Sequence, residues 1–179
     1  MMHGTESTLR ERQAHLKQEY RERPELGMQT SAVTSVTGAS DDPTRVRIAV
    51  DGIEGAVLEI AAHHAVGGTH AVPCSGDVFL AALAGCQEIT LRMVAAAIGL
   101  ELRHLSVRVE GDWDARGTLG VDREAPVGFQ ALRMRIEVDT DAPEDQLARL
   151  MKSAERYCVI ASTLKDAPPV EVSWSTSDT

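Results

Sequence analysis

The chain has 179 residues and a mass of 19.3 kDa, a length typical of one domain or of one domain with an appendage. Hydrophobic residues make up 43% of it and aromatic residues only 3%, so the core has to be aliphatic. The net charge is −9, from 18 basic and 27 acidic side chains. This charge argues against a nucleic-acid binder and against a binder of anionic membranes, because both need a basic surface.

The sequence shows neither the pattern of a secretory signal nor that of a membrane-spanning helix. It has no run of about 18 apolar residues, which a membrane-spanning helix needs, and its first residues lack the apolar stretch of a secretory signal. Its three cysteines are an odd number and do not suggest a disulfide scaffold. We therefore expect a cytoplasmic protein with thiols that are free for chemistry. The alternative is that the cysteines are small buried hydrophobic residues.

The first 27 residues are predicted to form a helical arm, and residues 28–179 the folded domain. Residues 5–23 are rich in charge and offer only a thin apolar face, which ends before Pro24. From Met28 onwards the sequence is typical of β-structure. Three antiparallel strands are expected within 28–38, 45–50 and 55–62, with a turn at Asp51-Gly52 between the last two.

Residues 77–100 predict one long helix that follows a candidate N-cap at Ser75 and ends at Gly99. Its first half is apolar nearly all round, so we expect it to be buried on most sides.

Alternating apolar and polar residues over 105–114 and 129–139 predict two half-buried strands, separated by a long turn. Helices are expected over 142–157 and 158–167, and a last strand over 170–174. This order of elements gives an α+β fold, with antiparallel sheet wrapped around two central helices. A homodimer would cover the very apolar helix from both sides.

Two cysteines occupy positions where thiol chemistry is possible. Cys158 lies where one predicted helix ends and the next begins, and a helix start favours thiolate. Cys86 lies inside the apolar helix, where burial raises the pKa of a thiol, so a reactive Cys86 needs a cation from elsewhere. The residues alone do not pair the two thiols, and a structural role for each stays open.

The segments around these cysteines resemble the OsmC/Ohr family of thiol peroxidases. The apolar run LAALAGC lies on one long helix, and a second cysteine follows in ERYCVIASTL. The resemblance extends over about residues 28–175 and implies the OsmC-like fold, an intertwined homodimer and reduction of organic hydroperoxides without a cofactor. It implies that Cys86 is the peroxidatic cysteine and Cys158 the resolving cysteine. A dithiol or lipoyl-type reductant would then reset the pair.

The sequence departs from the family at one position of the predicted site. Family members usually have a glutamate ten positions before the peroxidatic cysteine, which clamps an arginine, but here that position is Gly76. Asp77 either substitutes for this glutamate or caps the helix. The family's arginine comes from the N-terminal strands, which makes Arg45 and Arg47 the candidates, although both also suit a solvated strand face.

The departure at Gly76 supports an alternative from a different functional class. In that alternative the chain is an OsmC-fold module that has lost the clamp and binds a small ligand or a thiol.

Three further features allow a functional and a structural interpretation. Cys74 is an alternative resolving thiol or a small loop residue. One loop contains four residues of types that bind zinc: His63, His64, His70 and Cys74. Their spacing matches no known zinc finger, so we expect no metal there. Glu88 and Arg92 form either a helix-stabilising pair or a clamp near Cys86.

Overall fold

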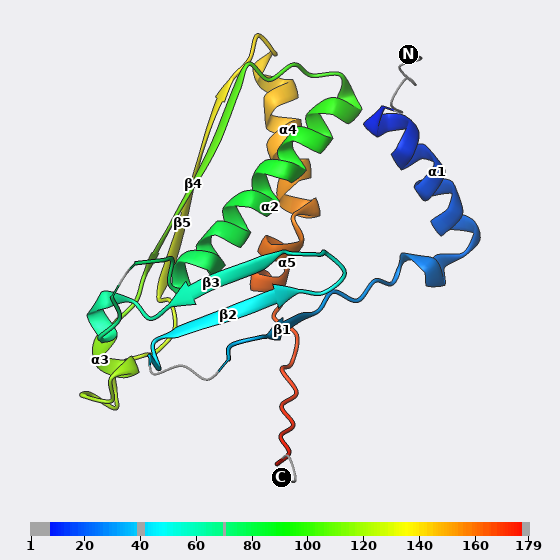
Figure 1. Cartoon of the computed structure of the whole chain (residues 1–179). Helices are drawn as coiled ribbons and strands as arrows, with labels where there is room; N and C mark the ends of the chain where they lie inside the picture. Colours follow the sequence, from blue (N-terminus) through cyan, green and yellow to red (C-terminus); the bar gives the residue numbers. More distant parts are fainter. Residues whose placement is uncertain (1–7, 39–41, 70, 177–179) are drawn as a thin grey trace, which may run out of the picture.

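The computed structural model describes residues 8–38, 42–69 and 71–176 (Figure 1). Its first element is α1, Leu9–Glu22, followed by the short 3-10 helix η1, Pro24–Gly27. Thr8 caps α1: its hydroxyl accepts from the N–H of Glu11, whose carboxylate accepts from the N–H of Thr8. The predicted helix of the arm is confirmed, and it lies apart from the strands (Figure 1). The domain boundary at residue 27 stays a prediction.

Three short strands form the first sheet, in the antiparallel order β1-β2-β3. They are β1, Val33–Ser35, β2, Arg45–Val50, and β3, Val57–Ala61. The three predicted strands are confirmed, but the first is shorter than expected. The connection between β2 and β3 is a loop over residues 51–56 rather than a two-residue turn, with Gly52 and Gly55 at positive φ.

The long helix α2, Ser75–Ile98, runs through the middle of the molecule (Figure 1). The prediction of Ser75 as its N-cap was wrong, because Cys74 is the N-cap. The Cys74 thiol accepts from the N–H of Asp77 at 3.4 Å, and the Asp77 carboxylate accepts from the N–H of Cys74 at 2.9 Å. Gly99, with a φ of +72°, ends the helix as expected.

A second antiparallel sheet, of β4, His104–Asp112, and β5, Ala131–Asp139, covers one side of α2. The predicted turn between these strands contains the one-turn helix α3, Ala115–Thr118. The helices α4, Glu144–Tyr157, and α5, Val159–Lys165, follow and pack against α2. The buried core lies among α2, α4 and β4 and is aliphatic, as predicted: Leu91, Ala95, Leu100, Leu105, Leu150 and Ala154.

The prediction of a last strand was wrong for the described chain. Residues 169–176 form no helix or strand and extend away from the body (Figure 1). Val170, Val172 and Trp174 are 85%, 84% and 88% exposed. Their alternation is typical of a strand, but no strand in the described part of the chain pairs with them. The α+β class stands, with two separate sheets in place of one.

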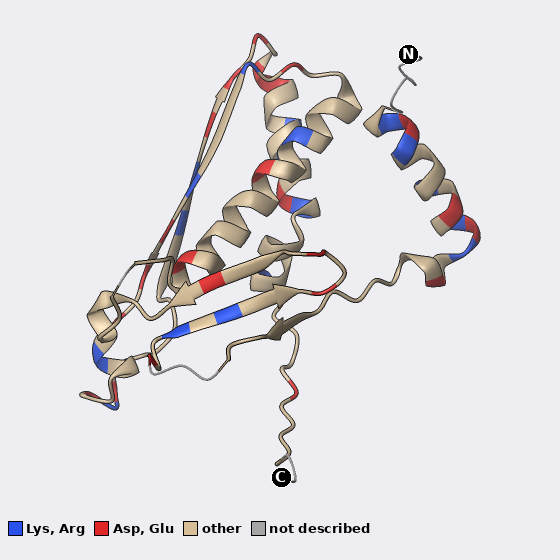
Figure 2. Cartoon of the chain, viewed as in Figure 1, with Lys and Arg blue, Asp and Glu red and all other residues tan. Residues whose placement is uncertain are grey.

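The predicted burial of α2 on most sides also fails within the single chain. Its buried residues follow one stripe at every fourth position: Leu83, Gln87, Leu91 and Ala95. The opposite side is exposed and mostly uncharged (Figure 2). Within the described residues α2 is also the one helix long and apolar enough to cross a membrane, contrary to the expectation from apolar runs. The core helix of a soluble protein meets the same criteria of length and composition, so these criteria alone do not place α2 in a membrane.

Candidate active site

The site lies where the first half of α2 meets the junction of α4 and α5. Cys86 comes from α2 and is partly buried, whereas Cys158 lies between the two later helices and is fully buried. The extended backbone of Cys158, with φ −72° and ψ +110°, ends α4 and begins α5. Leu91 of α2 and Leu150 of α4 belong to the same buried cluster, and this packing holds the junction beside α2.

Four hydrogen-bonding groups affect the pKa of the Cys86 thiol. Burial disfavours its thiolate, but four donors together lower the pKa below the ordinary value of a thiol. In decreasing order of effect they are the backbone N–H of Ile160, the thiol of Cys158, the backbone N–H of Val159 and the hydroxyl of Thr90. The Thr90 hydroxyl has a single proton, which it donates to the carbonyl oxygen of Cys86 at 2.7 Å. Its effect on the pKa of the Cys86 thiol is therefore the smallest of the four.

The pKa of Cys158 is shifted in the opposite direction. Burial raises it most, and the hydrogen bond to Cys86 and the charge of the Cys86 thiolate raise it further. The backbone N–H of Ala161, 3.5 Å from the Cys158 sulfur, opposes these effects. The structure therefore brings the two thiols together, with Cys158 as the proton donor and Cys86 as the acceptor.

This arrangement corrects two sequence expectations about the thiols. We expected the helix start to favour thiolate at Cys158, but burial outweighs the N–H groups of Ala161 and Ile160 there, and the N–H groups of Val159 and Ile160 lower the pKa of Cys86. We also expected Cys86 to need a cation, but neutral donors lower its pKa. The residues that sequence reasoning missed are Val159, Ile160 and Thr90. The only signal for the first two was the helix start after Cys158, because the approach of α5 to α2 is a tertiary contact.

Arg45 and Arg47 lie away from this donor set, on β2. Their side chains line a surface hollow together with Thr37 and Glu59. Both residues are exposed, which fits the solvated strand face that the sequence left open. Within the described chain the structure does not bring either arginine to Cys86.

Asp77 takes the capping role that was one of its two expected roles. Its carboxylate closes the cap at Cys74, in the first turn of α2. Gly76, at the position of the family's glutamate, faces the ring of Phe129: a Cβ at residue 76 would lie 3.3 Å from the Phe129 Cζ. A longer side chain at position 76 would therefore meet this ring.

Cys74 lies too far along the helix to resolve Cys86 within the chain. Twelve positions of helix separate the two residues, a rise of about 18 Å. A disulfide requires Cα atoms within about 7 Å. Of its two expected roles, the structural one is observed, as the N-cap of α2.

The remaining candidates have structural roles in the described residues. The rings of His63 and His64 lie 4.1 Å apart, and the Nδ1 of His63 accepts from the N–H of Ala65. His70 lies outside the described residues, and those described contain no group of three potential metal ligands. Glu88 accepts two hydrogen bonds from Arg92, at 2.9 and 2.7 Å, which is the helix-stabilising pair.

Comparison with known proteins gives one family. Residues 68–173 match the sequence model of the OsmC-like protein family. Among curated proteins no sequence matches the chain.

Several solved structures share the fold at low sequence identity. An OsmC-like protein from Mycoplasma pneumoniae is 17% identical, with a TM-score of 0.59 over 78% of this chain and 89% of its own. An OsmC-like protein of unknown function from Vibrio cholerae is 16% identical, with a TM-score of 0.61 over 76% and 94%. An organic hydroperoxide resistance protein OsmC from Legionella pneumophila is 17% identical, with a TM-score of 0.56 over 78% and 91%. These structures confirm the OsmC-like fold.

Proposed function

We propose that this chain, which belongs to the OsmC-like family, is a thiol-dependent peroxidase that reduces organic hydroperoxides. The observation that carries the proposal is the neighbouring pair of Cys86 and Cys158, at the contact of α2 with α5, whose pKa values are shifted in opposite directions. Solved structures of the same fold include organic hydroperoxide resistance proteins from Legionella pneumophila and Elizabethkingia anophelis, which supports this substrate class.

In the first step the Cys86 thiolate attacks the terminal oxygen of the hydroperoxide. The O–O bond breaks, an S–O bond forms, and the leaving alkoxide takes a proton from water and departs as an alcohol. Cys86 is oxidised to a sulfenic acid and the hydroperoxide is reduced. The N–H groups of Val159 and Ile160 keep Cys86 in the nucleophilic form before the attack.

In the second step Cys158 attacks the sulfur of the sulfenic acid, which releases water and forms a disulfide. Burial keeps Cys158 protonated, and while Cys86 is a thiolate its charge and its interaction with Cys158 raise the pKa of Cys158 further. Oxidation of Cys86 removes this charge, and the N–H of Ala161 remains to stabilise a Cys158 thiolate. The pKa of Cys158 should therefore fall after the first step, although burial continues to oppose its ionisation.

A dithiol of the lipoyl type would close the cycle by reducing the Cys86–Cys158 disulfide and becoming a cyclic disulfide itself. Such a cycle needs a reducing compartment, which fits the cytoplasmic location expected from the cysteine content.

We also propose that the working form is a homodimer. The exposed side of α2 carries small and apolar residues without charge: Ala81, Ala82, Gly85, Ile89 and Met93. A helix face of this kind lets a second backbone approach closely. Val170, Val172 and Trp174 are exposed and alternate as in a strand. This segment would pair with a sheet edge of a second copy. In this dimer Arg45 or Arg47 would complete the site around Cys86.

The test is turnover of cumene hydroperoxide by the full chain with dihydrolipoamide as the reductant. We expect Cys86→Ser to abolish turnover and Cys158→Ser to stop after one oxidation, while Cys74→Ser, a change away from the pair, keeps it. Arg45→Ala and Arg47→Ala test the arginine, which should slow the reaction in at least one variant. If parental Cys86 reacts with the hydroperoxide no faster than a free thiol, the peroxidase proposal fails.

A further inference from the structure

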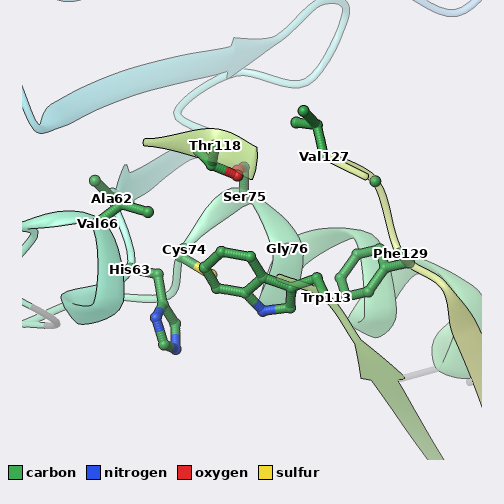
Figure 3. A pocket seen from close by; sticks show the side chains of 11 residues that line it. Ala62, His63, Val66, Cys74, Ser75, Gly76, Trp113, Thr118, Val127 and Phe129 are labelled. Atoms are coloured by element: carbon green, nitrogen blue, oxygen red, sulfur yellow. The ribbon is translucent and has the colours of Figure 1, made fainter. Parts of the chain in front are cut away.

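A cavity in the described part of the chain lies at the start of α2, away from the thiol pair. It has a volume of about 300 Å³ and is lined by the chain just after β3, by the start of α2, and by residues of α3 and of the segments that flank it (Figure 3). Cys74 and Gly76 lie on its α2 side, and twelve helical positions, a rise of about 18 Å, separate Cys74 from Cys86. The cavity is therefore distinct from the site of the proposed peroxidase reaction within the chain.

Aromatic rings gather around this cavity, although the chain has only six Phe, Trp and Tyr residues. Trp113 and Phe129 line it, and Phe79 stacks behind Phe129 with ring centroids 5.5 Å apart. His63 meets Trp113 edge-on at 5.2 Å. The buried core contains no aromatic residue, so the aromatic rings are concentrated at an open cavity instead.

The glycines at the cavity hold it open and fix one of its walls. A Cβ at Gly111 would lie 2.6 Å from the Phe129 ring, so only glycine lets this ring lie against β4. A Cβ at Gly76 would lie 3.3 Å from the same ring and 3.5 Å from the Cys74 sulfur. Any longer side chain at position 76 would enter the cavity. The residue that departs from the family pattern is thus the one that leaves this space empty.

The chemistry of the lining defines the ligand. The described lining residues include no Lys, Arg, Asp or Glu, so apart from the imidazole of His63 a charged ligand finds no group there to balance its charge. Trp113, Thr118 and Ser75 bring a small number of polar groups to mostly apolar walls. The volume lies at the lower end of the range of about 300–1,000 Å³ for ligand pockets. Aromatic walls favour a ligand with a π-face, which stacks or packs edge-on.

We propose that this cavity binds a small, uncharged aromatic molecule of one ring with a single hydroxyl-type polar group. The ligand packs against Trp113 and Phe129, and Gly76 provides the space for it. The proposal stands independently of the peroxidase function, because neither Cys86 nor Cys158 lines the cavity.

The test uses 4-fluorobenzyl alcohol as the probe and follows its fluorine resonance as the full chain is titrated. The measurement is made in the Cys86→Ser variant, so that the outcome does not depend on peroxidase chemistry. We expect saturable binding. 4-Fluorobenzoate, which has the same ring and a negative charge, should bind at least about tenfold more weakly, because a buried unpaired charge is costly. Cyclohexylmethanol, without a π-face, should also bind more weakly.

Substitutions at the cavity locate the probe. Gly76→Ala should weaken binding, and Gly76→Leu, which fills the space, should weaken it by at least about tenfold. Gly85→Ala is the matched control, because it adds the same methyl group to the same helix with nothing within 4 Å of the new Cβ. Trp113→Leu should weaken binding by about three- to tenfold through the lost ring contact, even if Gly76→Leu fails to fold.

Three results would overturn the proposal. The first is no binding by the parent, as would occur if a second copy filled the cavity in solution. The second is 4-fluorobenzoate binding as tightly as the alcohol, which would indicate an anion site at the start of α2. The third is binding that survives both Trp113→Leu and Gly76→Leu unchanged.

Discussion

Removal of one backbone N–H should raise the pKa of Cys86. Val159 is the first residue of α5, and its N–H is one of the donors to the Cys86 sulfur. Val159→Pro removes this N–H and leaves the helix intact, because proline is well tolerated at the first helical position. Cys158, the residue before it, already has the extended backbone that a following proline requires. The Val159 side chain is 68% exposed, so little packing is lost.

The magnitude follows from the charge on the acceptor. A hydrogen bond to a charged group contributes about 1.5–3 kcal/mol. Cys86 is partly exposed and Val159 is the third of its four donors, so the lower end applies. About 1.4 kcal/mol corresponds to one pKa unit. Val159→Pro should therefore raise the pKa of Cys86 by about one unit and cut the thiolate present at neutral pH by up to about tenfold.

The assay is the pH dependence of Cys86 alkylation by iodoacetamide, followed by mass spectrometry of the peptide that contains it. The background is Cys74→Ser, which removes the second thiol of that peptide. Only thiolate reacts, so the rate rises with pH and levels off above the pKa, and the midpoint of this rise in the parent should lie below the pKa of a free thiol. Val159→Ala, which keeps the N–H, is the control and should titrate like the parent. If the proline and alanine variants titrate identically, the start of α5 does not activate Cys86.

Three other predictions concern the resolving thiol, the cap and the C-terminal segment. Cys158→Ala should raise the pKa of Cys86 more than Cys158→Ser, because serine keeps a hydrogen-bond donor. In both variants excess cumene hydroperoxide should oxidise Cys86 to sulfinic acid, since no resolving thiol remains. Mass spectrometry that shows no sulfinic acid would contradict this. Cys74→Ala should lose about 1 kcal/mol in urea unfolding while Cys74→Ser, a good N-cap, loses less; equal losses would exclude a capping role. Truncation after Asp166 should shift the sedimenting species from dimer to monomer, and an unchanged dimer would show that residues 167–179 do not contribute to association.

The sequence was most informative where a pattern is local. The alternation in β4 and β5 and the glycine at position 99 predicted elements that the structure confirms, because strand faces and helix ends depend on near neighbours. The prediction of a last strand was wrong because it used only such a local pattern. Val170, Val172 and Trp174 have the period of a strand, but a strand also needs an edge to pair with, and the pattern does not say which chain provides one.

The chemistry of the site could be predicted only in part, for a related reason. The two cysteines were identified, through their resemblance to the family, as a pair. The resemblance also gave Cys86 as the attacking thiol, but the cause of its lowered pKa could not be deduced from the residues, since it depends on where the N–H groups of α5 lie after packing. Burial alone would have left Cys86 inert and the helix start would have favoured Cys158. The tertiary contact between α5 and α2 reverses both expectations.

This contact also couples the two halves of the proposed reaction. Cys158 is at once the end of α4, the N-cap of α5 and the proton donor to Cys86. A displacement of α5 away from α2 would remove the Val159 and Ile160 donors from Cys86, and it would also separate the sulfur atoms that must join. Activation of the attacking thiol and formation of the disulfide therefore depend on the same packing, which the buried Leu150 and Leu91 maintain. Substitutions that loosen this packing should slow both steps together, whereas Val159→Pro should slow the first alone.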